Sequence, residues 1–179
     1  MHLSTILASV VLTIASLTTA QPLEVRQAPD RFYLQTQVVP GINDCGSNKQ
    51  GLYVYSYHTG AGLGVAAASA DSSDDSWFYL NGTQLMWTYE GNTIGPWPVV
   101  VSSYPYQAFN PISISIASAG SQEGYSTNGT GLQSTAAGGG WIACDWWFTA
   151  PQIFAVTGYR NTPLPTSCSK VNLILVPVA

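Results

Sequence analysis

Short alternating segments, separated by turns rich in glycine and proline, constrain this chain more than any other feature. In Leu52–His58 (LYVYSYH) three tyrosines fall on one face, because successive side chains of a strand point to opposite sides. Asn81-Gly82 separates the aromatic-rich segments Trp77–Leu80 and Gln84–Tyr89, and an Asn-Gly pair in that setting is a strong hairpin signal. The pattern predicts an antiparallel, all-β fold.

The same alternation predicts the rest of the sheet. Further strands are expected at Arg31–Val39, Pro98–Ser103, Ile112–Ala117, Trp141–Cys144, Ile153–Thr157 and Val171–Val176. The alanine run Val65–Ala70 is the one segment with a helical pattern, and it is bounded by Gly64 and Asp71. Helix is therefore expected to contribute at most a short piece.

An aromatic-led unit recurs at nearly equal spacing along the chain. It begins at Phe32, at Phe78 and at Tyr125, and the last two copies share the pattern Asn-Gly-Thr-x-Leu. Three such units favour a compact antiparallel barrel with a β-trefoil-like arrangement, in which Val171–Val176 pairs with Arg31–Val39. A β-sandwich is the alternative, because hairpin turns look alike in both folds.

The first residues are typical of a secretory signal peptide. The apolar run Ile6–Leu17 is followed by small residues at Thr18–Ala20, and it is too short to span a bilayer. We therefore expect a signal peptide at residues 1–20, a short propeptide or loose tail at 21–30, and a single β domain at 31–179. The protein is expected to be secreted, to the extracellular space or the cell wall.

Cysteines and glycosylation motifs agree with this compartment. Cys144 follows one expected strand and Cys168 precedes another, whereas Cys45 lies in a turn where the pattern fixes no partner. We predict a Cys144–Cys168 disulfide and leave the state of Cys45 open. The Asn-x-Thr motifs at Asn81 and Asn128 fall in expected turns, so both are candidate glycosylation sites.

Composition argues against several functions. Only 8% of the residues are charged, and the 5 Lys+Arg against 9 Asp+Glu cannot form the basic surface that nucleic acids require. His58 is the one histidine after residue 20, and the sequence has no GxSxG, HExxH, P-loop, GxGxxG or CxxC motif. We therefore expect no catalytic residue, no metal and no cofactor.

Aromatic side chains supply the candidate carbohydrate-binding residues. Tyr55, Tyr57 and His58 lie on one expected strand, and Asp145 and Trp147 lie in the densest aromatic stretch of the chain. Tyr and Trp rings can stack on sugars while nearby polar groups bind hydroxyls, although the same rings also fill β cores. A sugar platform is expected to place two rings coplanar and exposed. A glycoside hydrolase requires a pair of carboxylates, and Asp145 has no second acid close by in sequence.

Four segments carry a resemblance to a known family. They are Gly51–Leu63, Phe78–Leu85, Trp141–Phe154 and Pro165–Val171. These segments resemble a family of small secreted fungal proteins that is described only as a domain of unknown function. More distantly, the tail is similar to the C-terminal domain of fungal cell-wall mannoproteins with internal repeats, but the repeat region is missing here. The resemblance implies secretion and a place at the cell wall, without a catalytic residue or covalent wall linkage.

These observations favour a non-catalytic secreted fungal protein that acts at or near the cell surface or in host interaction. A lectin-like carbohydrate-binding protein is the alternative, and a glycoside hydrolase ranks third. The expected partners are cell-wall polysaccharide or a host surface, with no role for nucleic acid or membrane.

Overall fold

The computed structural model describes residues 28–41, 48–72, 75–104, 106–116, 122–146, 149–157 and 162–178. Its strands are β1 (Phe32–Val38), β2 (Tyr53–Gly60), β3 (Leu63–Ser69), β4 (Ser76–Asn81), β5 (Gln84–Tyr89), β6 (Trp97–Val101), β7 (Phe109–Ile114), β8 (Tyr125–Asn128), β9 (Gly131–Ser134), β10 (Trp141–Cys144), β11 (Gln152–Val156) and β12 (Cys168–Pro177). One 3₁₀ turn, Thr135–Ala137, follows β9. The predicted all-β class is confirmed. Within the described ranges, no helix has the length and apolar character needed to cross a membrane.

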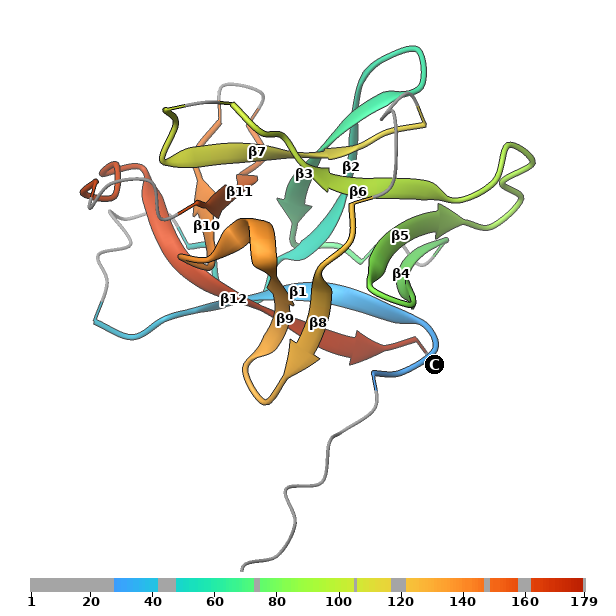
Figure 1. Cartoon of the computed structure of the whole chain (residues 1–179), viewed down its shortest axis with the longest axis horizontal. Helices are drawn as coiled ribbons and strands as arrows, with labels where there is room; N and C mark the ends of the chain where they lie inside the picture. The colour runs from blue at the N-terminus through green and yellow to red at the C-terminus, as the bar shows by residue number, and fades with distance from the viewer. Residues whose placement is uncertain are drawn as a thin grey trace, which may run out of the picture.

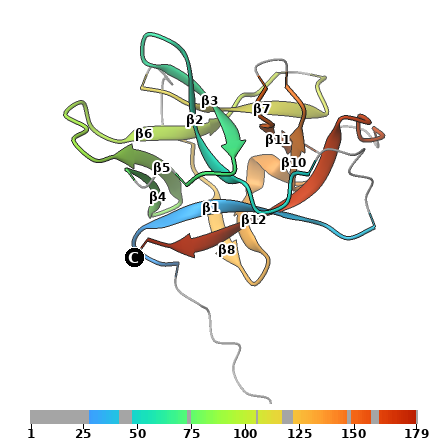
Figure 2. The same cartoon turned by 180° about the vertical axis from the view of Figure 1, so that it is seen from behind.

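The first and last strands close the sheet into an antiparallel barrel (Figures 1 and 2). β1 pairs with β12 along its whole length, from Phe32 opposite Pro177 to Val38 opposite Val171. β1 also pairs with β4, and the pairing continues through β5, β6, β7, β11 and β10 back to β12. The predicted barrel, and the predicted pairing of its first strand with its last, are therefore confirmed.

Three hairpins meet at one side of this barrel, and two of them, β6–β7 and β10–β11, also belong to its closed ring of strands. They are β2–β3, β6–β7 and β10–β11, and each contacts the other two through the pairs β3–β7, β11–β7 and β11–β3. In Figure 1 they lie above β1 and β12. The hairpin β8–β9 forms a separate two-stranded sheet that packs against β12. A polypeptide closed in this way leaves few unpaired sheet edges, which suits a folded domain that must avoid edge-to-edge association.

The core lies between the barrel strands and contains the first aromatic residue of each recurring unit. Phe32, Phe78 and Tyr125 are 0%, 1% and 2% exposed and belong to one buried cluster. Phe32 stands opposite Phe78 across the β1–β4 pair. Burial of an aromatic or large aliphatic side chain stabilises the fold by about 1.5–3 kcal/mol, so these positions anchor the barrel. The recurrence seen in the sequence therefore marks core positions.

The alanine run is a strand, which corrects the predicted helix at Val65–Ala70. β3 pairs with β2, with Tyr57 opposite Val65 and Tyr55 opposite Ala67. The alanines at 66–68 are at most 1% exposed, because β7 and β11 pair with the same strand. Helix propensity differs by less than about 1 kcal/mol per residue among most residue types, so pairing in the barrel outweighs it.

The strand predicted at Ile112–Ala117 begins and ends earlier than expected. β7 spans Phe109–Ile114, and its inward positions are Asn110, Ile112 and Ile114. The alternation then breaks, because Ser115 is buried and Ile116 is exposed. The Ser115 hydroxyl donates a hydrogen bond to the Gly62 carbonyl at 2.6 Å, which compensates its burial.

The hairpin predicted around Asn81-Gly82 forms, with its turn one residue further along. Asn81 is paired with Gln84, so the two-residue loop is Gly82-Thr83. Gly82 has a φ of +62°, a left-handed conformation that glycine adopts without a steric penalty. The side chain of Asn81 is thereby left exposed at the end of β4.

Candidate functional site: a groove beside the disulfide

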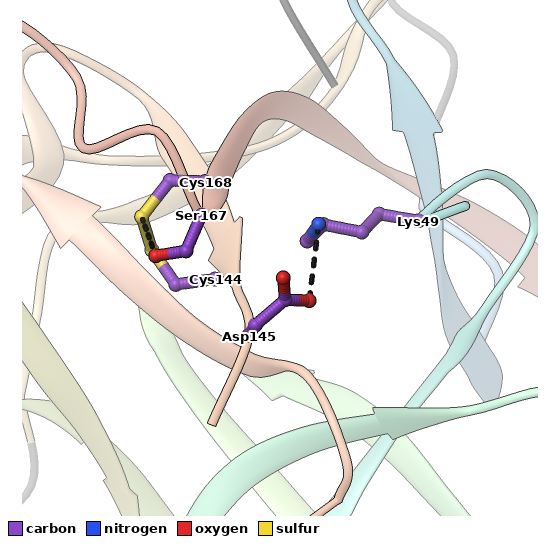
Figure 3. The surroundings of a disulfide bond; sticks show 5 residues. All are labelled: Lys49, Cys144, Asp145, Ser167 and Cys168. Atoms are coloured by element: carbon purple, nitrogen blue, oxygen red, sulfur yellow. Dashed lines mark hydrogen bonds and ion pairs between the residues drawn. A yellow bond between two sulfur atoms is a disulfide. The ribbon is translucent and has the colours of Figure 1, made fainter. Parts of the chain in front are cut away.

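A disulfide joins Cys144 of β10 to Cys168 of β12, as predicted (Figure 3). The two residues stand directly opposite each other in the β10–β12 pair. Their Cα atoms are 4.0 Å apart, closer than the usual 4.4–6.8 Å. The reason is the register: the Asp145 N–H bonds the Ser167 carbonyl on the next rung, so the cysteines occupy a non-hydrogen-bonded pair, where antiparallel strands approach most closely.

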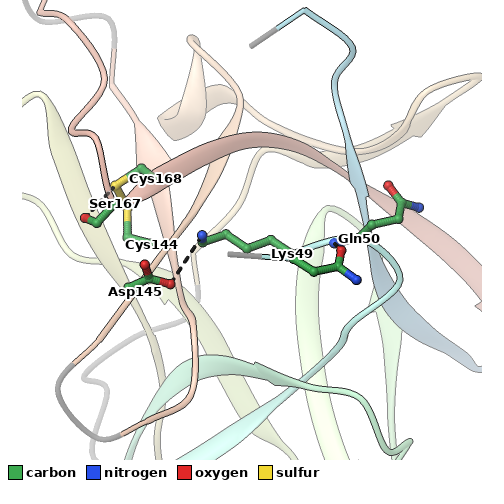
Figure 4. Close-up of polar contacts among 7 residues, drawn as sticks. Lys49, Gln50, Cys144, Asp145, Ser167 and Cys168 are labelled. Carbon is green, nitrogen blue, oxygen red and sulfur yellow. Dashed lines mark hydrogen bonds and ion pairs between the residues drawn. A yellow bond between two sulfur atoms is a disulfide. The ribbon is translucent and has the colours of Figure 1, made fainter. Parts of the chain in front are cut away.

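A lysine lies beside this disulfide with its side chain inside the protein. The Lys49 side chain is 0% exposed, and its Nζ lies 3.3 Å from Oδ1 of Asp145, whose side chain is 48% exposed. Figures 3 and 4 show the lysine extending from the segment before β2 toward Asp145. Buried charges in proteins are normally paired, and this carboxylate supplies one such partner.

The segment that carries Lys49 is fastened to β1. Thr36 donates its hydroxyl hydrogen bond to the Lys49 carbonyl at 2.6 Å, and the Gly51 N–H bonds the Thr36 carbonyl at 2.8 Å. The Val38 N–H bonds Oε1 of Gln50 at 2.8 Å. These bonds fix the backbone from which the lysine reaches Asp145.

A groove of about 570 Å³ opens next to this ion pair. The segment before β2, the end of β3 and the residues on either side of the β10–β11 connection form its walls, with Asn48, Ser69, Asp145, Trp146 and Thr149 among the lining residues. Thr149 has a φ of +72°, an uncommon value for a residue other than glycine. Such a backbone is retained at a site when its surroundings hold it in place.

Trp146 connects the groove to the tyrosines of β2. Its ring meets the Tyr57 ring edge-on, with centroids 5.2 Å apart and planes at 78°. The Tyr55 and Tyr57 rings are 6.4 Å apart and inclined by 58°. Both tyrosines are partly exposed. Neither pair is coplanar, so these rings offer an inclined edge to a ligand and no flat platform.

Burial affects the tyrosine hydroxyl chemistry on this face. It raises the pKa of Tyr55, and the nearby Tyr57 adds a smaller increase by charge repulsion. A tyrosine with the ordinary pKa near 10 is already protonated at neutral pH, so this increase only extends to higher pH the range in which the Tyr55 hydroxyl can donate a hydrogen bond.

The remaining predicted site residues lie apart from the groove or outside the described chain. His58 is exposed on β2 opposite Gly64. Asn128 is exposed at the end of β8, and its Oδ1 accepts hydrogen bonds from the Thr130 N–H and hydroxyl at 2.9 and 2.7 Å. Trp147, Cys45, the predicted signal peptide at 1–20 and residues 21–27 of the predicted segment 21–30 lie outside the described residues. The structure thus places Asp145 in the groove and Tyr57 against the groove residue Trp146, and it leaves His58 at the surface.

Sequence analysis did not identify Lys49 as a site residue. It lies in a glycine- and asparagine-rich stretch, where a lysine is normally exposed, and its partner Asp145 is far away in sequence. No local pattern could have joined the two. Within the described ranges, no group of three or more His, Cys, Asp or Glu side chains is placed to hold a metal ion.

The fold and site define an all-β barrel domain with a cross-strand disulfide and an open groove beside a lysine–aspartate pair. The chain belongs to the family described as Domain of unknown function (DUF7907), whose model matches residues 29–177. No curated protein and no solved structure matches the chain. The resemblance to a family of unknown function is therefore confirmed at the level of the family.

Proposed function

We propose that this protein is a secreted, non-catalytic fungal binding domain that acts at or near the cell surface or in host interaction. The Cys144–Cys168 disulfide carries the proposal, because disulfides persist in extracellular and secretory compartments and are rare in the cytosol. The apolar run Ile6–Leu17 supports the same compartment. The more distant likeness of the tail to cell-wall mannoproteins supports a location at the wall.

The surroundings of Asp145 support a binding role over a hydrolytic one. Glycosidases use two carboxyl groups that face each other across the scissile bond. Here a partner of Asp145 is the buried Lys49 ammonium group. A half-exposed carboxylate held in this way is suited to accept hydrogen bonds from a ligand at the edge of the groove.

Secretion is tested by expressing the full chain in a filamentous fungus. We expect the protein in the culture medium, with an N-terminus beginning after Ala20, and a lower mass on enzymatic removal of N-glycans from Asn81 and Asn128. A matched variant carrying Val11→Arg in the apolar run should remain in the cells. Recovery of the unaltered chain only from cells, with residues 1–20 intact, contradicts the proposal.

A second candidate function is lectin-like binding of cell-wall polysaccharide or host-surface glycan in the groove. The observation that favours it is the edge-on Tyr57–Trp146 pair beside the half-exposed Asp145. Binding to insoluble wall polysaccharide, measured by co-sedimentation, should fall at least tenfold in Trp146→Ala. Trp77→Ala is the matched control, because Trp77 lies against Arg31 and is not among the described residues that line the groove. Equal co-sedimentation of both variants and the unaltered protein contradicts this candidate.

We also propose that the barrel has a β-trefoil-like arrangement and is not a sandwich. The mutual contacts of β2–β3, β6–β7 and β10–β11, together with the buried aromatics Phe32, Phe78 and Tyr125, support a threefold pattern. A crystal structure tests it: the three hairpins should superpose by rotation about one axis. Two facing sheets with open edges would contradict it.

A further inference from the structure

A second groove, of about 550 Å³, lies at the junction of β6, β7 and β11. Tyr104 and Tyr106 follow β6, Asn110 lies on β7, and Gln122 and Thr157 complete the part used in this argument. It shares no described lining residue with the groove beside Asp145.

Asn110 places a polar amide where the strand pattern requires an apolar side chain. It is 4% exposed and takes the first of the inward positions on β7 that Ile112 and Ile114 continue. Its Oδ1 is buried and has no hydrogen-bond partner within the described part of the chain. A buried acceptor without a partner destabilises a fold by about 1–3 kcal/mol, and such groups are rare in native proteins. A role in ligand binding explains why this amide lines a groove.

Two tyrosines stand exposed at the mouth of the same groove. Tyr104 is 52% exposed and Tyr106 is 77% exposed. The Gln107 N–H bonds the Tyr104 carbonyl at 3.3 Å across the turn, and Tyr106 has a φ of +70°. A left-handed tyrosine is uncommon, and such conformations cluster at binding sites. Tyrosine rings give a large, rigid contact with an apolar face and a polar edge.

The amide and hydroxyl groups around these rings are already oriented. Oε1 of Gln122 accepts the Val101 N–H at 2.6 Å and the Tyr125 hydroxyl at 3.3 Å, which leaves the amide nitrogen of Gln122 as its donor end. The Thr157 hydroxyl donates to the Gln107 carbonyl at 2.9 Å, so its oxygen lone pairs serve as acceptors. The groove therefore presents both donors and acceptors on positioned side chains.

The charge of the groove selects the ligand class. Among the described residues that line it, none carries a charged side chain. A charged ligand would lose hydration without gaining an opposite charge, whereas a neutral polyhydroxylated ligand can exchange its water hydrogen bonds for those of the amides and hydroxyls. Exposed aromatic rings beside such groups suit the apolar C–H faces and hydroxyl edges of sugars.

We propose that this second groove binds a neutral saccharide, with Tyr104 and Tyr106 packing on the sugar rings and the Asn110 and Gln122 amides bonding hydroxyl groups. The inference deepens the proposed binding role and rests on it, while naming a surface different from the Asp145 groove. It also gives a reason for the polar residue at an inward position of β7.

The test uses the secreted full-length protein and isothermal titration calorimetry with three soluble probes: linear oligomers of β-1,3-linked glucose, of β-1,4-linked N-acetylglucosamine and of mannose. We expect association with at least one probe, and at least a tenfold loss in Tyr106→Ala. Asn110→Leu should show the same loss with a thermal midpoint equal to or above that of the unaltered protein, because leucine removes the unpartnered amide and keeps the branching of the side chain at Cγ. Ile94→Ala, at a site 64% exposed outside the groove, is the control and should bind normally.

The outcomes separate this inference from the proposed function. Loss of binding in Trp146→Ala with normal binding in Tyr106→Ala places the saccharide in the Asp145 groove and overturns the inference while preserving a lectin role. A lower thermal midpoint in Asn110→Leu shows that the amide is structural, which also overturns the inference. Absence of heat with all three probes overturns it as well, whereas secretion can still be established independently.

Discussion

Removal of the Cys144–Cys168 disulfide should lower the stability of the barrel by a calculable amount. The two cysteines are 24 residues apart in sequence, so the bond closes a loop of that size in the unfolded chain. On the chain-entropy relation, a loop of this length corresponds to about 3.5 kcal/mol at 25 °C. β10 and β12 remain paired by backbone hydrogen bonds, so the native structure should persist without the bond. The expected change in thermal midpoint is roughly 7–14 °C for a domain of this size.

The assay compares urea unfolding of a Cys45→Ser protein with that of a protein that also carries Cys144→Ala and Cys168→Ala. The Cys45→Ser background prevents thiol exchange, and it should itself unfold like the unaltered chain. The unfolding free energy should fall more steeply with urea concentration in the disulfide-free protein, because its unfolded state exposes more surface.

Two results would refute this reasoning. One is a stability difference below about 1 kcal/mol between these two proteins, which would show that the loop gives no entropic stabilisation. The other is a Cys45→Ser protein that loses as much stability as the disulfide-free protein, which would mean that Cys45 takes part in the bond.

Further perturbations follow from buried residues and from one tight turn. Burial raises the pKa of Tyr125 in the folded protein above its unfolded value near 10. The stability that Tyr125 contributes is therefore complete below about pH 10 and declines as the pH rises above it. Tyr125→Phe should reduce this alkaline decline, measured as the urea midpoint at each pH. Gly131→Ala should lower the unfolding free energy by more than about 2 kcal/mol, because Gly131 has a φ of +119° and an added Cβ overlaps the Leu173 carbonyl. Gly129→Ala is the control, and it should unfold like the unaltered protein because nothing lies near an added Cβ there. Lys49→Met keeps the length of the buried side chain and should change the unfolding free energy by less than about 1 kcal/mol. Lys49→Ala should lower the unfolding free energy by about 2–3 kcal/mol, because it removes buried packing. Equal losses in the two variants would show that the packing of the lysine stem is not what stabilises the fold.

The barrel strands were predictable where the signal is local. Alternation located most strands, and the barrel inferred from the three recurring aromatic-led units gave the pairing of Arg31–Val39 with Val171–Val176. The disulfide was predicted because Cys144 and Cys168 lie at the ends of two expected strands. The helix prediction for Val65–Ala70 was wrong because alanine favours helix locally, whereas the pairing of this segment with β7 and β11 depends on residues distant in sequence.

The grooves were less accessible to sequence reasoning. Asp145 was identified, but its partner Lys49 comes from the other end of the chain, and their contact exists only after β1 and β12 have paired. The predicted strand began at Ile112, whereas Asn110 precedes a proline, a combination that favours a turn and gives no strand signal. An unsatisfied amide is visible only when all of its neighbours are in place.

The pairing of β1 with β12 also has a consequence for how the protein is made. The strand that emerges first from the ribosome must wait for the strand that emerges last, so the barrel cannot close during most of synthesis. Folds dominated by pairings between distant residues form slowly, because loop closure precedes the stabilising contacts. Until then β1 presents an open edge that can pair with other chains, so we expect folding of this protein to depend on chaperones that keep that edge covered.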